Sequence, residues 1–162
     1  MEGNTYAAAS KEPWATTATF FSDLVRCETR LYNALNDRLR SSHGIAASQF
    51  EFLRYLRDHP GARVGDLAGF FAIGVGATSK GMDRLEERGW VRRVPNPADR
   101  RSSLLELTDA GIELVNDAEG AFAAISELIQ AAIEPEELQT MAQALRRLRT
   151  ALEHDRVGMP VG

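Results

Sequence analysis

The sequence predicts a mainly helical α+β fold that contains one small β-hairpin. Apolar residues recur every three or four positions near both ends of the chain, as they do on the buried face of an α-helix. In the middle, two short strand-like segments flank the turn Pro95-Asn96-Pro97, which is typical of a hairpin. With 162 residues, of which 44% are hydrophobic and 26% charged, the chain is long enough to bury the core of one globular domain.

The first helix is predicted to run from about Pro13 to about Arg40, because proline suits the first helical turn and an apolar stripe follows it. The stripe consists of Phe20, Leu24, Cys27, Leu31, Leu35 and Leu39. A helix of this length spans roughly 40 Å, which a compact domain of this size cannot cover alone. We therefore expect part of the stripe to contact a second subunit.

Two more apolar stripes occupy the last third of the chain. The first is continuous and predicts one helix; it comprises Ile112, Val115, Ala118, Phe122, Ile125 and Ile129. The second follows a helix-start signal, Glu134-Pro135-Glu136-Glu137, and comprises Leu138, Met141, Leu145, Leu148 and Leu152. Long amphipathic helices at both chain ends predict a dimerisation layer. The alternative is an intramolecular three-helix bundle.

The middle of the chain predicts three helices followed by the hairpin. The helices are expected at Ser48–Asp58, Arg63–Phe71 and Val75–Arg88, the last closed by Gly89, and the strands at Trp90–Val94 and Ser102–Leu107. This order is that of a winged helix-turn-helix. The predicted organisation is an N-terminal dimerisation helix (13–43), a winged helix-turn-helix (44–108) and C-terminal dimerisation helices (109–155), which form one intertwined domain per subunit.

The third of these middle helices has the two faces that a recognition helix needs. Thr78, Met82 and Leu85 share an inward face, and the cations Lys80, Arg84 and Arg88 share an outward one. Such cations reach phosphates or base edges in the major groove of DNA. The alternative is a solvated face whose cations pair with neighbouring acids, namely Asp83, Glu86 and Glu87.

The hairpin favours the DNA-binding interpretation. Its turn places Arg100 and Arg101 at the tip of a narrow protrusion, which fits the minor groove, and Asp99 can pair with an arginine there. From Thr78 to Arg101 there are seven cations and four anions, so this stretch carries +3 although the whole chain carries −4. Because phosphate attraction depends on the local field, the overall acidity does not exclude DNA binding.

The segment from Val64 to Gly111 resembles the MarR-type regulators, the multiple antibiotic resistance regulator family. The resemblance rests on DRLEERGWVRR, DRR and LELTDAG in this order and spacing. It implies a homodimer that binds a pseudopalindromic operator in double-stranded DNA, with half-sites about one turn apart. It also implies that Lys80 contacts bases or phosphates, that Arg101 enters the minor groove and that Asp99 supports it. The predicted DNA-binding residues are Gly76, Ala77, Ser79, Lys80, Arg84, Asp99, Arg100 and Arg101.

The sequence departs from this family at the third middle helix. Gly76 and Ala77 stand where many relatives have Ser, Thr or Pro. Gly81 lies in mid-helix and costs about 1 kcal/mol of helix propensity relative to alanine. We therefore expect a looser recognition helix that relies more on DNA shape.

The family resemblance also implies a small aromatic effector bound between the dimerisation layer and the DNA-binding region. Aromatic residues near that junction are the candidates for its pocket, although such residues are more often core. They are Trp14, Phe21, Tyr32, Phe50 and Tyr55. A second hypothesis is oxidant sensing by Cys27, opposed by its place on an apolar stripe, where a thiol behaves as a small hydrophobe.

Other function classes find little support. The chain has no Gly-rich phosphate loop and no nucleophile-base arrangement, which argues against an enzyme, and no cofactor is expected. His43, His59 and His154 are scattered, so no metal site is predicted. With one cysteine and no apolar run of membrane-spanning length, a cytoplasmic protein that does not enter membranes is expected. The resulting hypothesis is a cytoplasmic, ligand-modulated transcriptional repressor; the rival is a winged-helix module for protein association.

Overall fold

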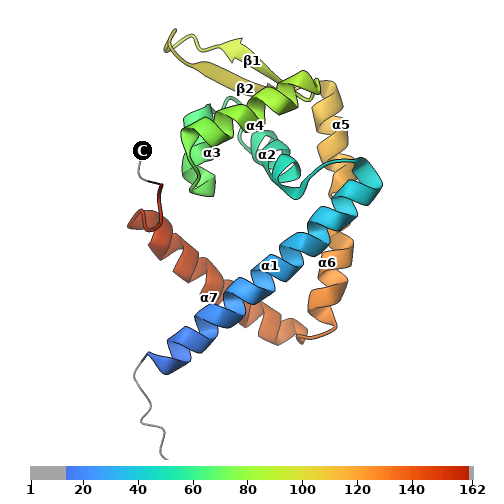
Figure 1. Cartoon of the computed structure of the whole chain (residues 1–162), viewed down its shortest axis with the longest axis vertical. Coiled ribbons are helices and arrows are strands. Elements are labelled where there is room, and N and C mark those ends of the chain that lie inside the picture. Colours follow the sequence, from blue (N-terminus) through green and yellow to red (C-terminus); the bar gives the residue numbers. More distant parts are fainter. Residues whose placement is uncertain (1–13, 161–162) are drawn as a thin grey trace, which may run out of the picture.

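The computed structural model describes residues 14–160 and shows, within that range, seven helices and one antiparallel two-stranded sheet (Figure 1). The helices are α1 (Ala15–His43), α2 (Ala47–Asp58), α3 (Val64–Phe71), α4 (Val75–Glu87), α5 (Asp109–Ala118), α6 (Ala121–Gln130) and α7 (Pro135–His154). The strands are β1 (Val91–Pro95) and β2 (Ser103–Leu107). The predicted fold class, mainly helical with one hairpin wing, is confirmed.

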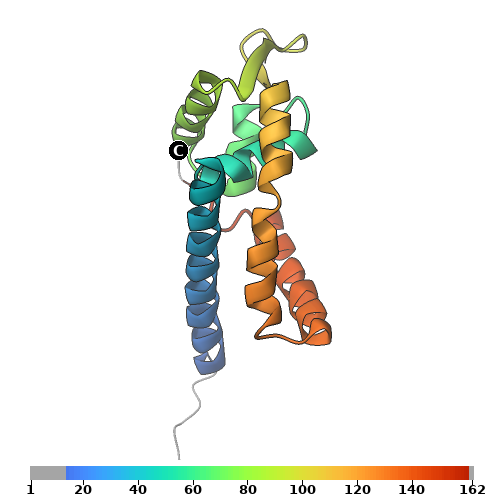
Figure 2. The same cartoon turned by 90° about the vertical axis from the view of Figure 1, so that its right-hand side faces the viewer.

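Helices α2, α3 and α4 and the hairpin form a lobe at one end of the subunit. In both Figure 1 and Figure 2 the hairpin lies at the top, and the N-terminal end of α1 lies at the bottom. α1 packs against α2, α5 and α6, so the long helix connects the lobe to the helical ends of the chain. None of the described helices combines the length and the apolar character needed to cross a membrane.

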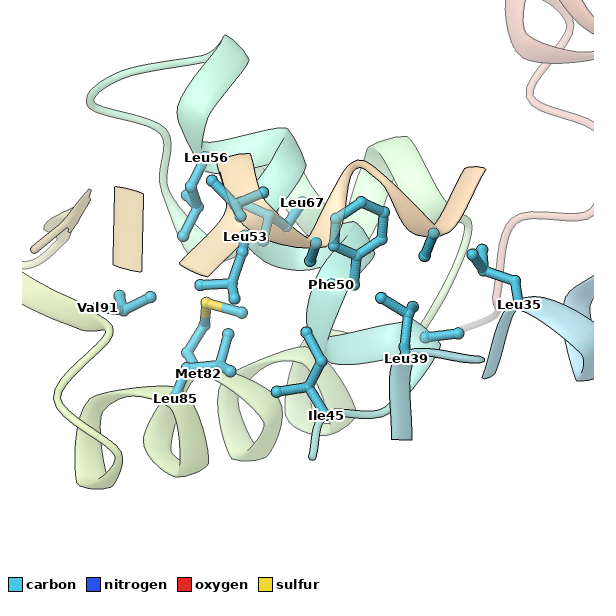
Figure 3. Packing of buried hydrophobic residues seen from close by; sticks show 14 of the residues in the cluster. Leu35, Leu39, Ile45, Phe50, Leu53, Leu56, Leu67, Met82, Leu85 and Val91 are labelled. Carbon is cyan, nitrogen blue, oxygen red and sulfur yellow. The ribbon is translucent and has the colours of Figure 1, made fainter. Parts of the chain in front are cut away.

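The core of the lobe holds α4 in place (Figure 3). Phe50 and Leu53 of α2 are fully buried, and so are Leu67 of α3 and Met82 and Leu85 of α4. Each such side chain contributes about 1.5–3 kcal/mol through removal of apolar surface from water. These residues belong to the apolar faces that the sequence predicts, and their packing fixes which side of α4 remains available at the surface.

The expectation of one continuous helix from Ile112 to Ile129 is wrong. α5 ends at Ala118 and α6 begins at Ala121. At the junction the Phe122 N–H donates to the Glu119 carbonyl (3.0 Å) and the Ala123 N–H to the Gly120 carbonyl (3.1 Å), which are i→i−3 rather than i→i−4 bonds. Glycine has the lowest helix propensity after proline, so the break falls at Gly120.

The helices at the chain ends do not form an intramolecular three-helix bundle. α1 packs along α6, but no residue of α7, all of which is described, is buried. α7 begins at Pro135, as predicted, and Figure 1 shows it crossing α1. Its C-terminal half lines an open hollow together with Leu24 of α1 and Phe70 of α3. In α1 the buried residues are Leu35 and Leu39, near its C-terminal end. The predicted helix start at Pro13 lies outside the described residues.

Candidate nucleic-acid interface

α4 presents its predicted DNA-contacting side chains on a face separate from its packing face. Thr78 is fully buried with Met82 and Leu85, and its hydroxyl donates to the Gly74 carbonyl (3.0 Å). Lys80 and Arg84 are exposed and make no ion pair with any residue between 14 and 160. Their charges are therefore available to an external anion.

The other predicted residues of α4 differ in exposure. Gly76 and Ala77 lie exposed in the first turn, whereas Ser79 is half-buried and lines a hollow shared with α3 and the hairpin. Arg88, expected to share the outward face of Lys80, lies with its guanidinium 5.1 Å from the centroid of the Trp90 ring. This cation–π contact holds Arg88 against the base of the hairpin.

Arg93 of β1 ties the hairpin to α4. Its Nη2 lies 2.7 Å from Oδ1 of Asp83, its Nη1 donates to Glu86, and its backbone N–H donates to the same Glu86 carboxylate (3.2 Å). Burial acts to lower the pKa of Arg93, but the hydrogen bonds to these two carboxylates outweigh it and the pKa is raised. Asp83 and Glu86 thus pair with the wing rather than with the cations of their own helix.

The tip of the wing is organised by side chains that cap its turn. Val94 pairs with Leu104 and Pro95 with Ser103 at the end of the ladder. Beyond it, the Asn96 side chain accepts a hydrogen bond from the Ala98 N–H (3.0 Å) and donates to the Ser102 hydroxyl (2.9 Å). This local network gives the tip a defined shape without apolar packing.

Arg100 and Arg101 are exposed at this tip, as the sequence predicts. The expectation that Asp99 pairs with an arginine side chain is wrong for the subunit between residues 14 and 160. Its carboxylate instead accepts a hydrogen bond from the backbone N–H of Arg101 (3.0 Å). Asp99 therefore positions Arg101 through the main chain, and the Arg101 guanidinium has no partner among the described residues.

Gly81 makes room for an aromatic ring rather than loosening the helix. α4 is continuous across it, and a Cβ placed at Gly81 would lie 2.7 Å from Cε2 of Phe52. The Phe52 ring is held in turn by an edge contact with Phe71, with centroids 5.3 Å apart. The close approach of a ring to the backbone explains the glycine, and the expected looser helix is not observed.

The run LELTDAG, residues 105–111, has a structural role at the base of the wing. The Thr108 hydroxyl donates to the Gly89 carbonyl (2.6 Å) and accepts from the Gly111 N–H (3.1 Å), so that it caps α5 and joins it to the start of the hairpin. A Cβ at Gly111 would lie 2.1 Å from the Trp90 carbonyl oxygen. Only a glycine allows this contact between α5 and the wing.

A cavity of about 560 Å³ lies between α1, α2, α6 and the end of α3, and we refer to it as the junction cavity. It is lined by Glu28, Leu31, Tyr32, Leu35, Ser48, Glu51, Phe52, Phe71, Ile73, Phe122 and Ile125. Sequence reasoning identified the aromatic character of this region and Tyr32. It missed the residues whose inward orientation depends on how α1, α2 and α6 meet, above all Phe52 and Phe122.

The structure does not bring the five predicted effector-pocket residues together. Tyr32 lines the junction cavity, whereas Tyr55 lines a smaller hollow beside His59 and Phe70. Phe50 is buried in the core, with its ring 5.7 Å from that of Phe122. Trp14 and Phe21 are 63% and 65% exposed near the N-terminal end of α1.

Two other sequence hypotheses concern cysteine and metal chemistry. Cys27 lies on the stripe of α1 as expected, but it is exposed in the subunit instead of packed. Between residues 14 and 160 there is no cluster of three potential metal ligands among His, Cys, Asp and Glu.

Comparison with known proteins places this architecture in a family. A model of the MarR family matches residues 45–103, which extend from just before α2 to the first residue of β2. The multiple antibiotic resistance protein MarR of Escherichia coli (strain K12) is 30% identical over 102 residues, which cover 59% of this chain and 71% of that protein. The chain belongs to the MarR family. The resemblance inferred from the three motifs is confirmed.

Other MarR-family proteins extend the match beyond the lobe. The HTH-type transcriptional regulator MhqR of Bacillus subtilis (strain 168) is 27% identical over 126 residues, which cover 74% of this chain and 85% of that protein. The crystal structure of Sco3205, a MarR family transcriptional regulator from Streptomyces coelicolor in complex with DNA, covers 93% of this chain and 98% of its own, with a TM-score of 0.79 and 25% identity. As a MarR-family member, the protein is a DNA-binding transcription regulator and not an enzyme.

Proposed function

We propose that the protein is a homodimeric repressor that binds a pseudopalindromic operator in double-stranded DNA and responds to a small effector. The observation that carries this proposal is the pairing of two cationic elements in one lobe. Lys80 and Arg84 are exposed on α4 and Arg101 on the wing, and Arg93 joins the two elements. A helix of this kind reads the major groove while a wing arginine enters the adjacent minor groove.

The exposed apolar stripes support the homodimer. Met141, Leu145 and Leu152 of α7 are 54%, 48% and 41% exposed, and Phe20 of α1 is 54% exposed. Large apolar side chains left exposed along one helical stripe are typical of an interaction site. A second copy that covers α1 and α7 by two-fold symmetry places two lobes on successive major grooves, about 34 Å apart. In this proposal residues 13–43 and 109–155 serve dimerisation, and residues 44–108 bind DNA.

The proposed repressor role follows from where the dimer would bind, and the proposed effector role follows from where the junction cavity lies. A dimer bound across promoter DNA excludes other proteins from it, and such a protein works in the cytoplasm beside its DNA. The junction cavity lies where the helical ends meet the lobe, so an occupant there touches the elements that set the distance between two lobes. We propose that the effector binds in this cavity.

The DNA-binding assignment is tested with Lys80→Ala and Arg101→Ala. Each variant is titrated with a duplex from the region upstream of its own coding sequence, over a series of salt concentrations, by fluorescence anisotropy. We expect each substitution to weaken binding about tenfold and to reduce the salt slope by about 1, with the dimer intact in light scattering. Arg38→Ala, an exposed arginine of α1, is the matched control and leaves affinity unchanged.

Unchanged affinity and unchanged salt slope for both variants contradict the site assignment. Absence of binding by the parent protein to any duplex in dilute salt contradicts DNA binding altogether and favours the rival, a winged-helix module for protein association. A monomer in light scattering contradicts the homodimer.

A further inference from the structure

The wall of the junction cavity combines apolar surface with negative charge. Its aliphatic and aromatic residues come from four elements, and its charged lining residues are the two carboxylates Glu28 and Glu51. No lysine, arginine or histidine belongs to the lining among residues 14–160. A ligand that enters the cavity therefore meets hydrophobic surface and an anionic wall.

Glu51 forms only a long ion pair, with Arg54 one helical turn away. The nearest arginine is Arg54, whose Nη1 lies 3.7 Å from Oε1 of Glu51, beyond hydrogen-bond distance. Glu119 competes for the same arginine, 3.6 Å from its Nε, and the Arg54 guanidinium lies 4.9 Å from the centroid of Phe122. Burial raises the pKa of Glu51, and Arg54 only partly opposes this. The desolvated carboxylate gains from any additional positive charge beside it.

The two carboxylates act on the same part of the cavity. The pKa of Tyr32 is raised first by burial, and then by the negative charges of Glu51 and of Glu28. Tyr32 itself lines the cavity, so the anionic field reaches the space that a ligand would occupy. A phenolate or carboxylate ligand placed there would be repelled and would also lose its hydration.

The aromatic rings in the cavity wall also favour a cation. Tyr32, Phe52, Phe71 and Phe122 all line the cavity. The faces of aromatic rings attract cations, most strongly where water is excluded, and rings combined with carboxylates are the usual recognition surface for quaternary ammonium groups. The volume of about 560 Å³ is in the range of sites for drug-sized molecules.

We propose that the junction cavity binds a lipophilic organic cation, one that carries a delocalised or quaternary positive charge within an aromatic body, and that it rejects aromatic anions of the same size. Glu28 and Glu51 supply the charge selectivity, and the aromatic and aliphatic wall supplies the affinity. The inference rests on the proposed function in so far as it takes this cavity to be the effector site.

The test uses two probes that differ almost only in charge, tetraphenylphosphonium and tetraphenylborate. Binding of each to the full-length protein without DNA is measured by isothermal titration calorimetry and by quenching of intrinsic fluorescence. We expect the phosphonium to bind at least about tenfold more tightly than the borate. Glu28→Gln and Glu51→Gln each weaken phosphonium binding about tenfold, and the double variant removes the preference for the cation. Glu113→Gln, an exposed acid of α5 outside the cavity, leaves binding unchanged.

Each outcome decides a separate claim. Equal or tighter binding of the borate overturns the proposed charge selectivity, as does a double variant that still binds the phosphonium more tightly than the borate. No binding of either probe overturns the proposal as a whole. DNA affinity of the same preparations, measured without probe, tests the proposed function independently: a protein that binds the phosphonium but no duplex keeps this inference and loses the DNA-binding function.

Discussion

Substitution of Gly81 by alanine tests whether the glycine exists to admit the Phe52 ring. The added Cβ would lie 2.7 Å from Cε2 and 3.4 Å from Cδ2 of Phe52. Carbon atoms in favourable contact are about 3.5–4.0 Å apart, so the ring must recede by about 1 Å against Phe71. Such overpacking costs about 1–3 kcal/mol, whereas alanine in a helix gains about 1 kcal/mol over glycine. Gly81→Ala is therefore expected to lower the free energy of unfolding by up to about 2 kcal/mol.

A double-mutant cycle isolates this contact from helix propensity. In the background of Phe52→Ala, where the ring is absent, Gly81→Ala is expected to stabilise the protein by about 1 kcal/mol. The free energies of unfolding come from urea denaturation at one fixed protein concentration, because dimerisation would otherwise shift the midpoint. Gly76→Ala is the matched control, since a Cβ there has nothing within 4 Å. A coupling energy of zero between positions 52 and 81 refutes the explanation.

Three further predictions concern the elements around α4. Arg93→Met is expected to lower the free energy of unfolding by about 1–2 kcal/mol, because it releases the wing from α4. The control Arg92→Met removes an exposed cross-strand ion pair and costs no more than about 0.5 kcal/mol. Equal losses for the two variants in urea denaturation contradict the role of Arg93 in joining the wing to α4. Thr108→Val removes the cap of α5 and the hydrogen bond to the Gly89 carbonyl and costs about 1–2 kcal/mol, and Thr108→Ser restores most of this stability. Identical denaturation midpoints for the two variants rule out a role of the hydroxyl. Hydrogen bonds from Arg63 hold the pKa of Asp66 below its ordinary 3.8, so its stabilising contribution is present above that value and is lost as the pH falls through the lower, folded-state pKa. The stability difference between the parent and Asp66→Asn therefore shrinks below pH 3.8, and a difference that stays constant under acid conditions contradicts it.

Much of the fold could be predicted from local pattern. The helices of the lobe begin and end within one residue of the predictions because their apolar faces and turn residues agree; α2, for example, spans Ala47–Asp58 against the expected Ser48–Asp58. The hairpin follows from its Pro-Asn-Pro turn, and each observed strand differs from its predicted range by one residue at one or both ends. The break at Gly120 escaped prediction because the apolar period continues across it, so that periodicity alone cannot separate α5 from α6.

The residues of the candidate DNA interface were easier to predict from the sequence than those of the junction cavity. Lys80 and Arg101 are exposed because they lie on the polar face of a helix and at the tip of a turn, and both positions follow from sequence spacing. The walls of the junction cavity are set instead by how separate helices meet. Phe50 and Phe52 are two residues apart, yet one is buried in the core and the other faces the cavity. That distinction requires the three-dimensional positions of α1 and α6.

The bond between Arg93 and α4 has a consequence for where the protein can bend. Since charged hydrogen bonds clamp the strand to the helix, the two parts that would meet the grooves keep a constant mutual orientation. The regular helical hydrogen bonding is interrupted instead at Glu119 and Gly120, where i→i−3 bonds join α5 to α6, and we expect bending to occur there. Adjustment of the spacing between two lobes is therefore expected at the α5–α6 junction, away from the surface proposed to contact DNA, and not between α4 and the wing.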